Sequence, residues 1–424
     1  MEINQIFKKK RSCLLYIIPV VIGLLCLITG YAFMVLTWKP ESQKISESVI
    51  RETAAAQLHK NPNELTDEDF KAITRLSLSG KRLYDIKLLR KFTNLKELDL
   101  ERIDVPEIDM PKWIALLVKA GIIKPSKKTL IIDLKPTKSL DKLQRLNLMG
   151  TNVKNIKPLK NLTNLQSLNL RETNVSDIRP LAGLKNLQYL NIFSTPVMDI
   201  NPLSNLINLR ELCIKETQVS NLEPVKGLIN LERLYIGGKN INNIEPLSGL
   251  LNLNEFDLQN SKVSDLQPIS KLTNLQKLHI EHSPIKTIEP VRELKNLNTI
   301  TFCGIEVFDF DLIKGLTNLK SLSVSQTGVL NFESVKNLKQ LEHLCLWVIN
   351  VSDLEPLREL TNLQRLILED MPISDLEPVK QLKKLELITV ELCDNISEKQ
   401  IEDLKKAFPN AEISYINRSS TGFP

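Results

Sequence analysis

The stretch VSDLEPLRELTNLQRLILED, residues Val351–Asp370, decides the fold, because closely similar stretches begin at Val175 and Val263. Leucine stands at each of the twelve positions that are met by counting in steps of 22 from Leu143 to Leu385. The fourth and sixth positions of each unit are also apolar and alternate with other residues, as in a strand buried on one face. Each unit therefore predicts one short strand, and successive units predict strands stacked in parallel.

The residues between these strands predict the opposite side of each unit. The L-x-x-L-x-L start of the unit is the leucine-rich-repeat pattern. Position 16 is proline in most units, with Leu312 and Ser334 as exceptions, and proline suits the first turn of a 3₁₀ or α element. An aspartate just before it, such as Asp177, can accept a hydrogen bond from free backbone N–H groups of that turn. Asparagine at position 22 predicts a hydrogen bond to backbone in the turn before the next strand.

The repeats predict an α/β fold, a leucine-rich-repeat solenoid with a curved parallel β-sheet on the concave face and 3₁₀ or short helical segments on the convex side. Terminal units need caps, because their core would otherwise be exposed. Thr66 begins a capping-box pattern within a helical N-cap, and residues 397–408 predict a C-terminal helix before a final strand. One transmembrane helix is expected before the repeats. The expected organisation is a cytosolic basic stub (1–12), a transmembrane helix (13–38), a linker and helical N-cap (39–72), repeats (73–384), a C-terminal cap (385–415) and a disordered tail (416–424).

The N-terminal segment predicts membrane insertion. Residues 14–36 carry no charge and are long enough to cross a hydrocarbon core as a helix. The basic residues 8–11 precede them, so the positive-inside rule leaves the N-terminus in the cytosol and places the repeats outside. We therefore expect a single-pass protein that contacts the lipid bilayer through residues 14–36. The alternative is a cleaved secretory signal, with residues 30–32 as the cleavage site and a secreted repeat domain.

The unit that begins at Leu95 is longer than 22 residues. Its extra residues include DMPKWIALLVKAG, in which Asp109 is a helix cap and Gly121 marks the exit. We expect an irregular region on the solenoid at residues 109–130. Two interpretations stay open, a decayed repeat and a protrusion that binds a partner around Trp113.

The composition argues against nucleic-acid binding. Lys plus Arg total 56 and Asp plus Glu total 50, and four of the six excess positive charges lie in residues 8–11. The remainder of the chain is close to neutral and only 5% of residues are aromatic, so neither a basic footprint nor a base-stacking surface is expected. No glycine-rich phosphate loop occurs, and no cofactor is expected.

The candidate chemical groups are too far apart for a metal site or a disulfide. His279 and His282 lie close together, but His343 is three strands away, on the order of 14 Å, and a third zinc ligand is missing. Cys303 and Cys345 lie two strands apart, near ~10 Å, beyond the reach of a disulfide. His343 and Cys345 share a strand face but lack an orienting third group, so no enzyme activity is expected. A cysteine-dependent enzyme is the least favoured alternative.

The wording VSDIRPLAGLKNLQYLNI, from Val175, resembles the internalin-type leucine-rich repeats of bacterial surface proteins. The resemblance covers roughly residues 45–415 and includes the 22-residue period and the helical N-cap. It implies a concave face that binds another protein. We find no immunoglobulin-like module or cell-wall sorting motif after the repeats, so a role in invasion or adhesion does not carry over. Phosphatase-regulating 22-residue repeat proteins have a similar period and act inside cells, which leaves an intracellular regulatory scaffold as the alternative.

The candidate binding residues lie on the concave face, where strand alternation places positions 3, 5 and 7 of each unit. These positions vary from unit to unit, as expected for a recognition surface, although drift on a solvated face gives the same variation. Exposed aromatic residues beside charges are typical of protein-binding hot spots, and scattered apolar surface residues are the alternative. The first cluster comprises Tyr189, Phe193 and Tyr235, and the second comprises His343, Cys345 and Trp347 beside Arg365, Ile367 and Glu369. We expect a non-catalytic scaffold that binds an unidentified protein there.

Overall fold

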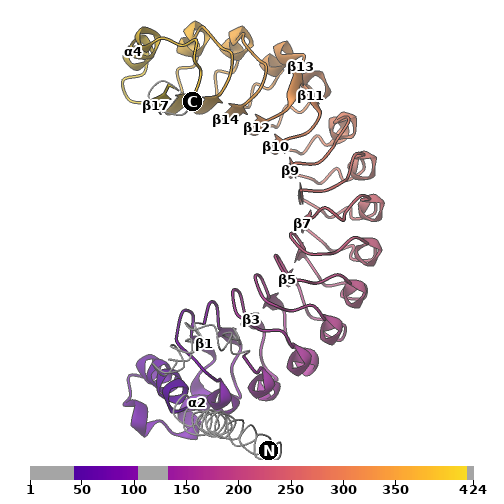
Figure 1. The fold of residues 1–424 in the computed structure, drawn as a ribbon, viewed down its shortest axis with the longest axis vertical. Coiled ribbons are helices and arrows are strands. Elements are labelled where there is room, and N and C mark those ends of the chain that lie inside the picture. The colour runs from indigo at the N-terminus through magenta and orange to yellow at the C-terminus, as the bar shows by residue number, and fades with distance from the viewer. Residues whose placement is uncertain (1–42, 104–131, 418–424) are drawn as a thin grey trace, which may run out of the picture.

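The structure, a computed structural model, describes residues 43–103 and 132–417. In this part of the chain, fifteen strands form one sheet in the order in which they occur in the sequence. Figure 1 shows the strands along the inner side of an arc and the short helical segments on its outer side. Neighbouring strands are parallel, and each unit pairs with the next, as Leu344 pairs with Leu366. The predicted solenoid with a curved parallel sheet on its concave face is confirmed.

The strands of the large sheet are three residues long in the N-terminal part and five residues long farther along. Their bounds are β1 Arg75–Ser77, β2 Glu97–Asp99, β3 Arg145–Asn147, β4 Ser167–Asn169, β5 Tyr189–Asn191, β6 Glu211–Cys213, β7 Arg233–Gly237, β8 Glu255–Gln259, β9 Lys277–Glu281, β10 Thr299–Cys303, β12 Ser321–Ser325, β14 His343–Trp347, β15 Arg365–Glu369, β16 Leu387–Glu391 and β17 Glu412–Ile416. A separate parallel pair, β11 (Val307–Asp309) and β13 (Gly328–Leu330), follows β10 and β12.

A 3₁₀ helix forms the outer segment of most units, and proline lies in its first turn, as predicted. In η5 (Arg179–Leu181), Asp177 Oδ1 accepts a hydrogen bond from Arg179 N at 3.0 Å. The carboxylates of Asp265, Asp353 and Asp375 make the same bond in their units. The other 3₁₀ helices are η1 Pro62–Glu64, η2 Lys87–Lys91, η3 Lys135–Ser139, η4 Lys157–Asn161, η6 Asn201–Leu203, η7 Glu223–Val225, η8 Glu245–Leu247, η9 Gln267–Ile269, η10 Glu289–Glu293, η11 Phe310–Leu312, η12 Phe332–Asn337, η13 Glu355–Glu359 and η14 Glu377–Gln381.

A single hydrophobic core runs the length of the described solenoid, from Ile50 to Phe408. The fourth and sixth positions of the units point into it, and Leu366 and Leu368 are both fully buried. Truncating a buried leucine to alanine costs about 2–5 kcal/mol, because it leaves a cavity. The repeated residues therefore contribute stability, while the residues that vary are on the open face.

Asparagine side chains tie each turn to the turn of the preceding unit. Asn186 Nδ2 donates to the carbonyl oxygen of Thr163 at 2.9 Å, and Asn208 Nδ2 donates to that of Lys185 at 2.8 Å. The same bond is made by Asn164, Asn230, Asn252, Asn274, Asn296, Asn318 and Asn362. The predicted bond from position 22 to backbone is confirmed, and this asparagine ladder holds the units in one register.

A left-handed turn follows every strand from β1 to β16 in the large sheet. Position 8 has a positive φ in each unit, which is easy for glycine and costly for a β-branched side chain. The residues are Gly80, Arg102, Gly150, Glu172, Ser194, Glu216, Gly238, Asn260, His282, Gly304, Gln326, Val348, Asp370 and Leu392. Val348, with a φ of 50°, is the β-branched member of this set.

Two of the units without proline at position 16, those with Leu312 and Ser334, are packed by phenylalanines instead. Phe308 contacts Phe310 with ring centroids 5.0 Å apart, and Phe310 contacts Phe332 at 5.2 Å. Strands β11 and β13 lie in these two units. An aromatic cluster therefore replaces the usual proline turn where Leu312 and Ser334 stand.

Helices lie at both ends of the described solenoid. A helix covers residues 43–58, and α2 (Asp67–Ala72) begins with a capping box in which Thr66 Oγ1 accepts from Asp69 N. At the other end, α4 (Glu398–Ala407) is capped by Ser397, and β17 follows it. The predicted capping box and the predicted C-terminal helix and strand are confirmed.

The predicted fold class is corrected in one part, the transmembrane helix before the repeats. In residues 43–103 and 132–417, no helix is long and apolar enough to cross a membrane. Spanning a bilayer takes about 20 apolar residues, whereas α4 has 10 residues and the helix at 43–58 carries charges such as Arg51. The segments expected at 13–38 and 109–130, and the tail beyond residue 417, lie outside the described residues. The domain boundaries stay predictions.

Candidate protein-binding face

In strands β2–β5, which are three residues long, the side chain at position 5 accepts a hydrogen bond from the backbone N–H two residues later. Asn147 Oδ1 accepts from Met149 N at 3.1 Å, and Asn169 Oδ1 accepts from Arg171 N at 3.1 Å. Asn191 makes the same bond. Such local bonds compete with the strand ladder. Over residues 233–391 this bond does not occur, and the strands of the large sheet present three positions to the concave face instead of two.

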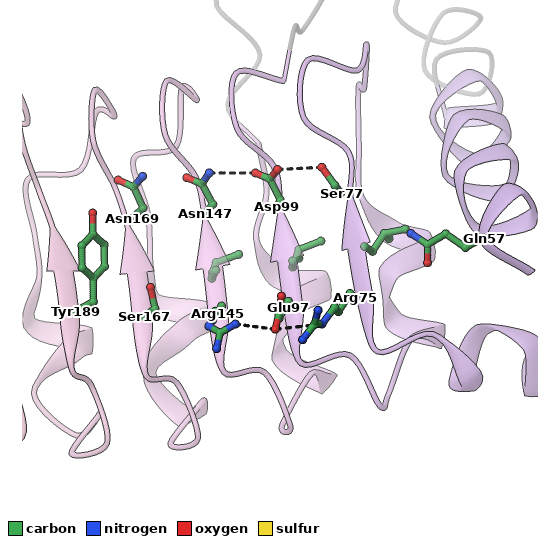
Figure 2. Close-up of a pocket in the computed structure, with 13 residues that line it drawn as sticks. Gln57, Arg75, Ser77, Glu97, Asp99, Arg145, Asn147, Ser167, Asn169 and Tyr189 are labelled. Carbon is green, nitrogen blue, oxygen red and sulfur yellow. Dashed lines mark hydrogen bonds and ion pairs between the residues drawn. The ribbon is translucent and has the colours of Figure 1, made fainter.

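A pocket of about 460 Å³ lies at the N-terminal end of the concave face. It extends from Gln57 on the first helix across β1–β4 to Tyr189 on β5, as Figure 2 shows. We call it the N-terminal pocket. Tyr189 is half-buried there, and burial raises the pKa of its phenol.

The charged groups of the N-terminal pocket are already paired with one another. Glu97 Oε1 lies 3.2 Å from Arg75 Nε and 2.8 Å from Arg145 Nη1. Two residues farther along the strands, the carboxylate of Asp99 accepts from Ser77 Oγ at 2.9 Å and from Asn147 Nδ2 at 3.1 Å. Figure 2 shows both rows crossing the strands. A ligand here has to replace internal bonds before it gains its own.

The middle of the concave face carries alternating charges that also pair internally. Arg233 lies 2.6 Å from Glu211, and Lys277 Nζ lies 3.2 Å from Glu255. Tyr235 Oη donates to Glu255 Oε1 at 3.0 Å. Burial and the neighbouring Glu255 raise the pKa of Tyr235, so it stays a neutral hydrogen-bond donor.

One ion pair in this central region is mostly buried. Lys215 Nζ lies 3.1 Å from Asp257 Oδ2, and the two side chains are 16% and 13% exposed. Gly237 lies between them in the sheet, and a Cβ there would stand 2.6 Å from the carbonyl oxygen of Gln259. Burial raises the pKa of Asp257, and its Oδ1 is buried without a hydrogen-bond partner. The attraction between Lys215 and Asp257 therefore offsets part of the cost of removing both charges from water at the centre of the face.

The first predicted aromatic cluster does not form. Tyr189 lies in the N-terminal pocket, Tyr235 bonds to Glu255, and Phe193 is covered by Arg171, whose Cζ lies 4.3 Å from its ring centroid. No ring contact joins these three residues in the part of the chain that is described. Each has found a separate polar neighbour, which their spacing in the sequence did not indicate.

The second predicted cluster comes together on two adjacent strands. In the register of β14 and β15, His343 pairs with Arg365, Cys345 with Ile367, and Trp347 with Glu369. We call these six residues the C-terminal patch. Arg365 is exposed, and the other five are half-buried.

Within the described residues, the charged side chains of the C-terminal patch have no ion-pair partner. Across residues 43–103 and 132–417, neither Arg365 nor Glu369 forms an ion pair, and His343 Nδ1 is buried without a hydrogen-bond partner. Burial raises the pKa of Glu369, and the charges of Glu391 and Asp370 raise it further. A ligand can therefore pair with Arg365 and Glu369 without breaking an existing ion pair in the described residues.

Cys345 is the one cysteine of the patch. Burial raises the pKa of the Cys345 thiol, which opposes the thiolate that a nucleophile requires. Cys213, Cys303, Cys345 and Cys393 are free thiols. No group of three His, Cys, Asp or Glu residues in the described ranges can hold a metal ion.

The open sheet and regular turns define a leucine-rich-repeat solenoid. The family described as Leucine Rich repeats (2 copies) matches residues 163–205 and 251–296. An internalin, InlF, of Listeria monocytogenes is 28% identical over 82% of this chain and 96% of its own, with a TM-score of 0.70. These matches support an internalin-like leucine-rich-repeat protein.

Two more distant structures share the fold. A leucine-rich-repeat protein of Leptospira interrogans is 22% identical, covering 82% of this chain and 97% of its own, with a TM-score of 0.57. The ectodomain of the plant receptor kinase GASSHO1/SCHENGEN3 of Arabidopsis thaliana, solved in complex with Casparian strip integrity factor 2, is 14% identical. It covers 84% of this chain and 52% of its own, with a TM-score of 0.50. No curated protein matches the chain.

Sequence reasoning missed three features of the face. Val348, exposed and left-handed, stands directly beside Trp347, and Glu391 extends the row of Trp347 and Glu369 onto β16. The N-terminal pocket was also missed, because it depends on how the first helix meets the sheet. A valine at position 8, where other units have mostly polar residues or glycine, is the signal that could have revealed the first of these.

Proposed function

We propose that this protein binds another protein through its concave face and that the C-terminal patch supplies the main contact. Leucine-rich-repeat domains of this kind are protein-interaction scaffolds. The observation that carries the proposal is the absence of internal partners for Arg365 and Glu369 beside the half-buried ring of Trp347, within the described chain. Tryptophan, tyrosine and arginine side chains are enriched among the residues that dominate the binding energy of protein interfaces.

The test compares two aromatic residues of the same face. Trp347→Ala is expected to weaken binding of the natural partner, found by crosslinking on intact cells, at least tenfold, about 1.4 kcal/mol or more. Tyr189→Ala in the paired N-terminal pocket is expected to weaken it less than threefold. Affinity would be measured by surface immobilisation of the full chain, with thermal melting as the folding control. Equal effects of the two substitutions would remove the patch from the proposal.

We also propose that the repeat domain works outside the cytoplasm. The support is the charge-free run at residues 14–36 after the basic residues 8–11, which is the arrangement of an export segment. Protease added to intact cells should then degrade the repeats, while a cytoplasmic marker stays whole. Protection of the repeats until the cells are lysed would contradict it.

A further inference from the structure

The C-terminal patch continues into a row of carboxylates that no cation of the described chain neutralises. Glu369 on β15 is the register partner of Glu391 on β16, so their backbones lie about 4.8 Å apart. Neither forms an ion pair within residues 43–103 and 132–417; Glu391 accepts a hydrogen bond from Ser414 Oγ at 2.9 Å. Two like charges on adjacent strands repel each other. An external cation would relieve that repulsion.

The ring of Trp347 stands at the end of the same row. Trp347 is the register partner of Glu369, so the indole and the two carboxylates occupy the same position of three successive units. The other aromatic side chain at this position is Phe193, and the guanidinium of Arg171, from the adjacent unit, lies 4.3 Å from its ring centroid. Trp347 has no such cation in the described chain. At this position of the described units, the ring of Phe193 is therefore covered by a guanidinium, whereas the ring of Trp347 has no cation on it.

Val348 adds an apolar contact beside the open position. Its φ of 50° is unfavourable for a β-branched residue, and 37% of its surface is exposed. The partial burial of the Val348 side chain does not compensate for the cost of its positive φ. The choice of valine at this position is therefore not explained by the stability of the solenoid. An apolar side chain at this point suits the methylene stem of a long basic side chain, whose charged end reaches farther.

We propose that the C-terminal patch binds a partner segment through an arginine side chain, stacked on Trp347 and paired with Glu369 and Glu391. This rests on the proposed function and specifies the chemistry of the partner. A guanidinium is favoured over an ammonium because it is planar, stacks on an aromatic face and can donate to two carboxylates at once. The stem of the arginine lies against Val348.

The experiment uses a fluorescein-labelled octapeptide of alternating arginine and glycine, titrated with the full chain and followed by anisotropy. The double variant Glu369→Gln/Glu391→Gln keeps the shape of both side chains and is expected to weaken binding at least tenfold. Trp347→Ala is expected to do the same. A peptide with lysine in place of arginine should bind at least threefold more weakly.

Two matched controls separate local pairing from a change in net charge. Glu223→Gln/Glu245→Gln removes two exposed carboxylates at the start of η7 and η8, on the convex side. Lys226→Gln removes an exposed positive charge at the end of η7, on the same convex side. Both should leave the affinity for the arginine peptide within threefold of the unmodified chain. The idea is overturned if Glu369→Gln/Glu391→Gln also stays within threefold, or if lysine binds as well as arginine.

The natural partner distinguishes failure of this inference from failure of the proposed function. If Trp347→Ala releases the partner but Glu369→Gln/Glu391→Gln does not, the patch binds the partner without a cation and the arginine assignment is wrong. If the arginine peptide depends on both carboxylates while Trp347→Ala leaves the partner bound, the cation site stands and the proposed function falls.

Discussion

The N-terminal pocket and the C-terminal patch lie on the same concave sheet but have opposite electrostatic arrangements. In the pocket, Glu97 lies between Arg75 and Arg145, and side chains satisfy one another. In the patch, Arg365 and Glu369 have no ion-pair partner in the described chain. Concavity alone therefore does not identify the binding region. In a pocket whose charged side chains pair with one another, binding a second protein gains little electrostatic energy. Unpaired charges beside an aromatic ring favour binding of a protein with complementary charge.

The largest expected effect lies between the two regions, at the buried pair of Lys215 and Asp257. Lys215→Met should lower the free energy of unfolding by about 2 kcal/mol at pH 7, because it leaves a mostly buried carboxylate uncompensated. Burial raises the pKa of Asp257 in the folded state, so protonation favours folding. The deficit should therefore shrink as pH falls from 7 toward about 4. Urea unfolding at several pH values measures it.

The matched control for that pair is Lys277→Met, which breaks a more exposed contact with Glu255. Lys277 is 49% exposed, against 16% for Lys215, so its loss should cost less than about 1 kcal/mol. If both variants lose the same free energy at every pH, burial of the pair has no special weight. The central region would then resemble the paired surface of the N-terminal pocket.

A second comparison uses the left-handed turn at both ends of the face. Val348→Asn at the patch should raise the free energy of unfolding by about 1 kcal/mol, because asparagine tolerates a positive φ. Gly80→Val beside the pocket should lower it by about the same amount; a Cβ there meets no atom within 4 Å, so only the backbone changes. Thermal and urea unfolding measure both. A loss of stability in Val348→Asn would mean that the valine serves the fold.

The smallest effects come from the same carboxyl-to-amide change at the two ends. Glu97→Gln should lower the free energy of unfolding by about 0.5 kcal/mol, because two arginines lose their partner. Glu369→Gln should raise it by roughly 0.3 kcal/mol at pH 7, because it removes repulsion from Glu391. The pKa of Glu369 is raised in the folded state, so this gain should vanish as pH falls and the unmodified carboxyl becomes protonated. If urea unfolding shows that Glu97→Gln and Glu369→Gln change the free energy of unfolding in the same direction, the two regions do not differ in their electrostatic arrangement.

The scaffold was predictable from sequence because each of its residues has one partner at a fixed spacing. Asp177 bonds to the turn two residues on, and Asn186 bonds to backbone 23 residues before it. The core positions follow from alternation alone. These interactions depend on the strand register, and the 22-residue period of the sequence determines that register.

The open face was less predictable, because its side chains choose among several neighbours. Arg171 packs on the ring of Phe193, and Tyr235 donates a hydrogen bond to Glu255. The aromatic residues of the first predicted cluster therefore do not contact one another. The meeting of Trp347 with Glu369 was predictable because they are direct register partners. The transmembrane helix of the predicted fold class was a judgement from hydropathy, and the described residues contain no helix that could span a membrane.

The asparagine ladder has a consequence for how such a molecule can change. Each rung joins one unit to the preceding unit by the same bond, so insertion or loss of a whole unit leaves both flanking joints intact. The separation of the N-terminal pocket and the C-terminal patch then changes in steps of about 4.8 Å along the sheet. Unequal recombination between repeats would therefore change the distance between the two regions by a whole number of strand spacings and leave the structure of each region unchanged.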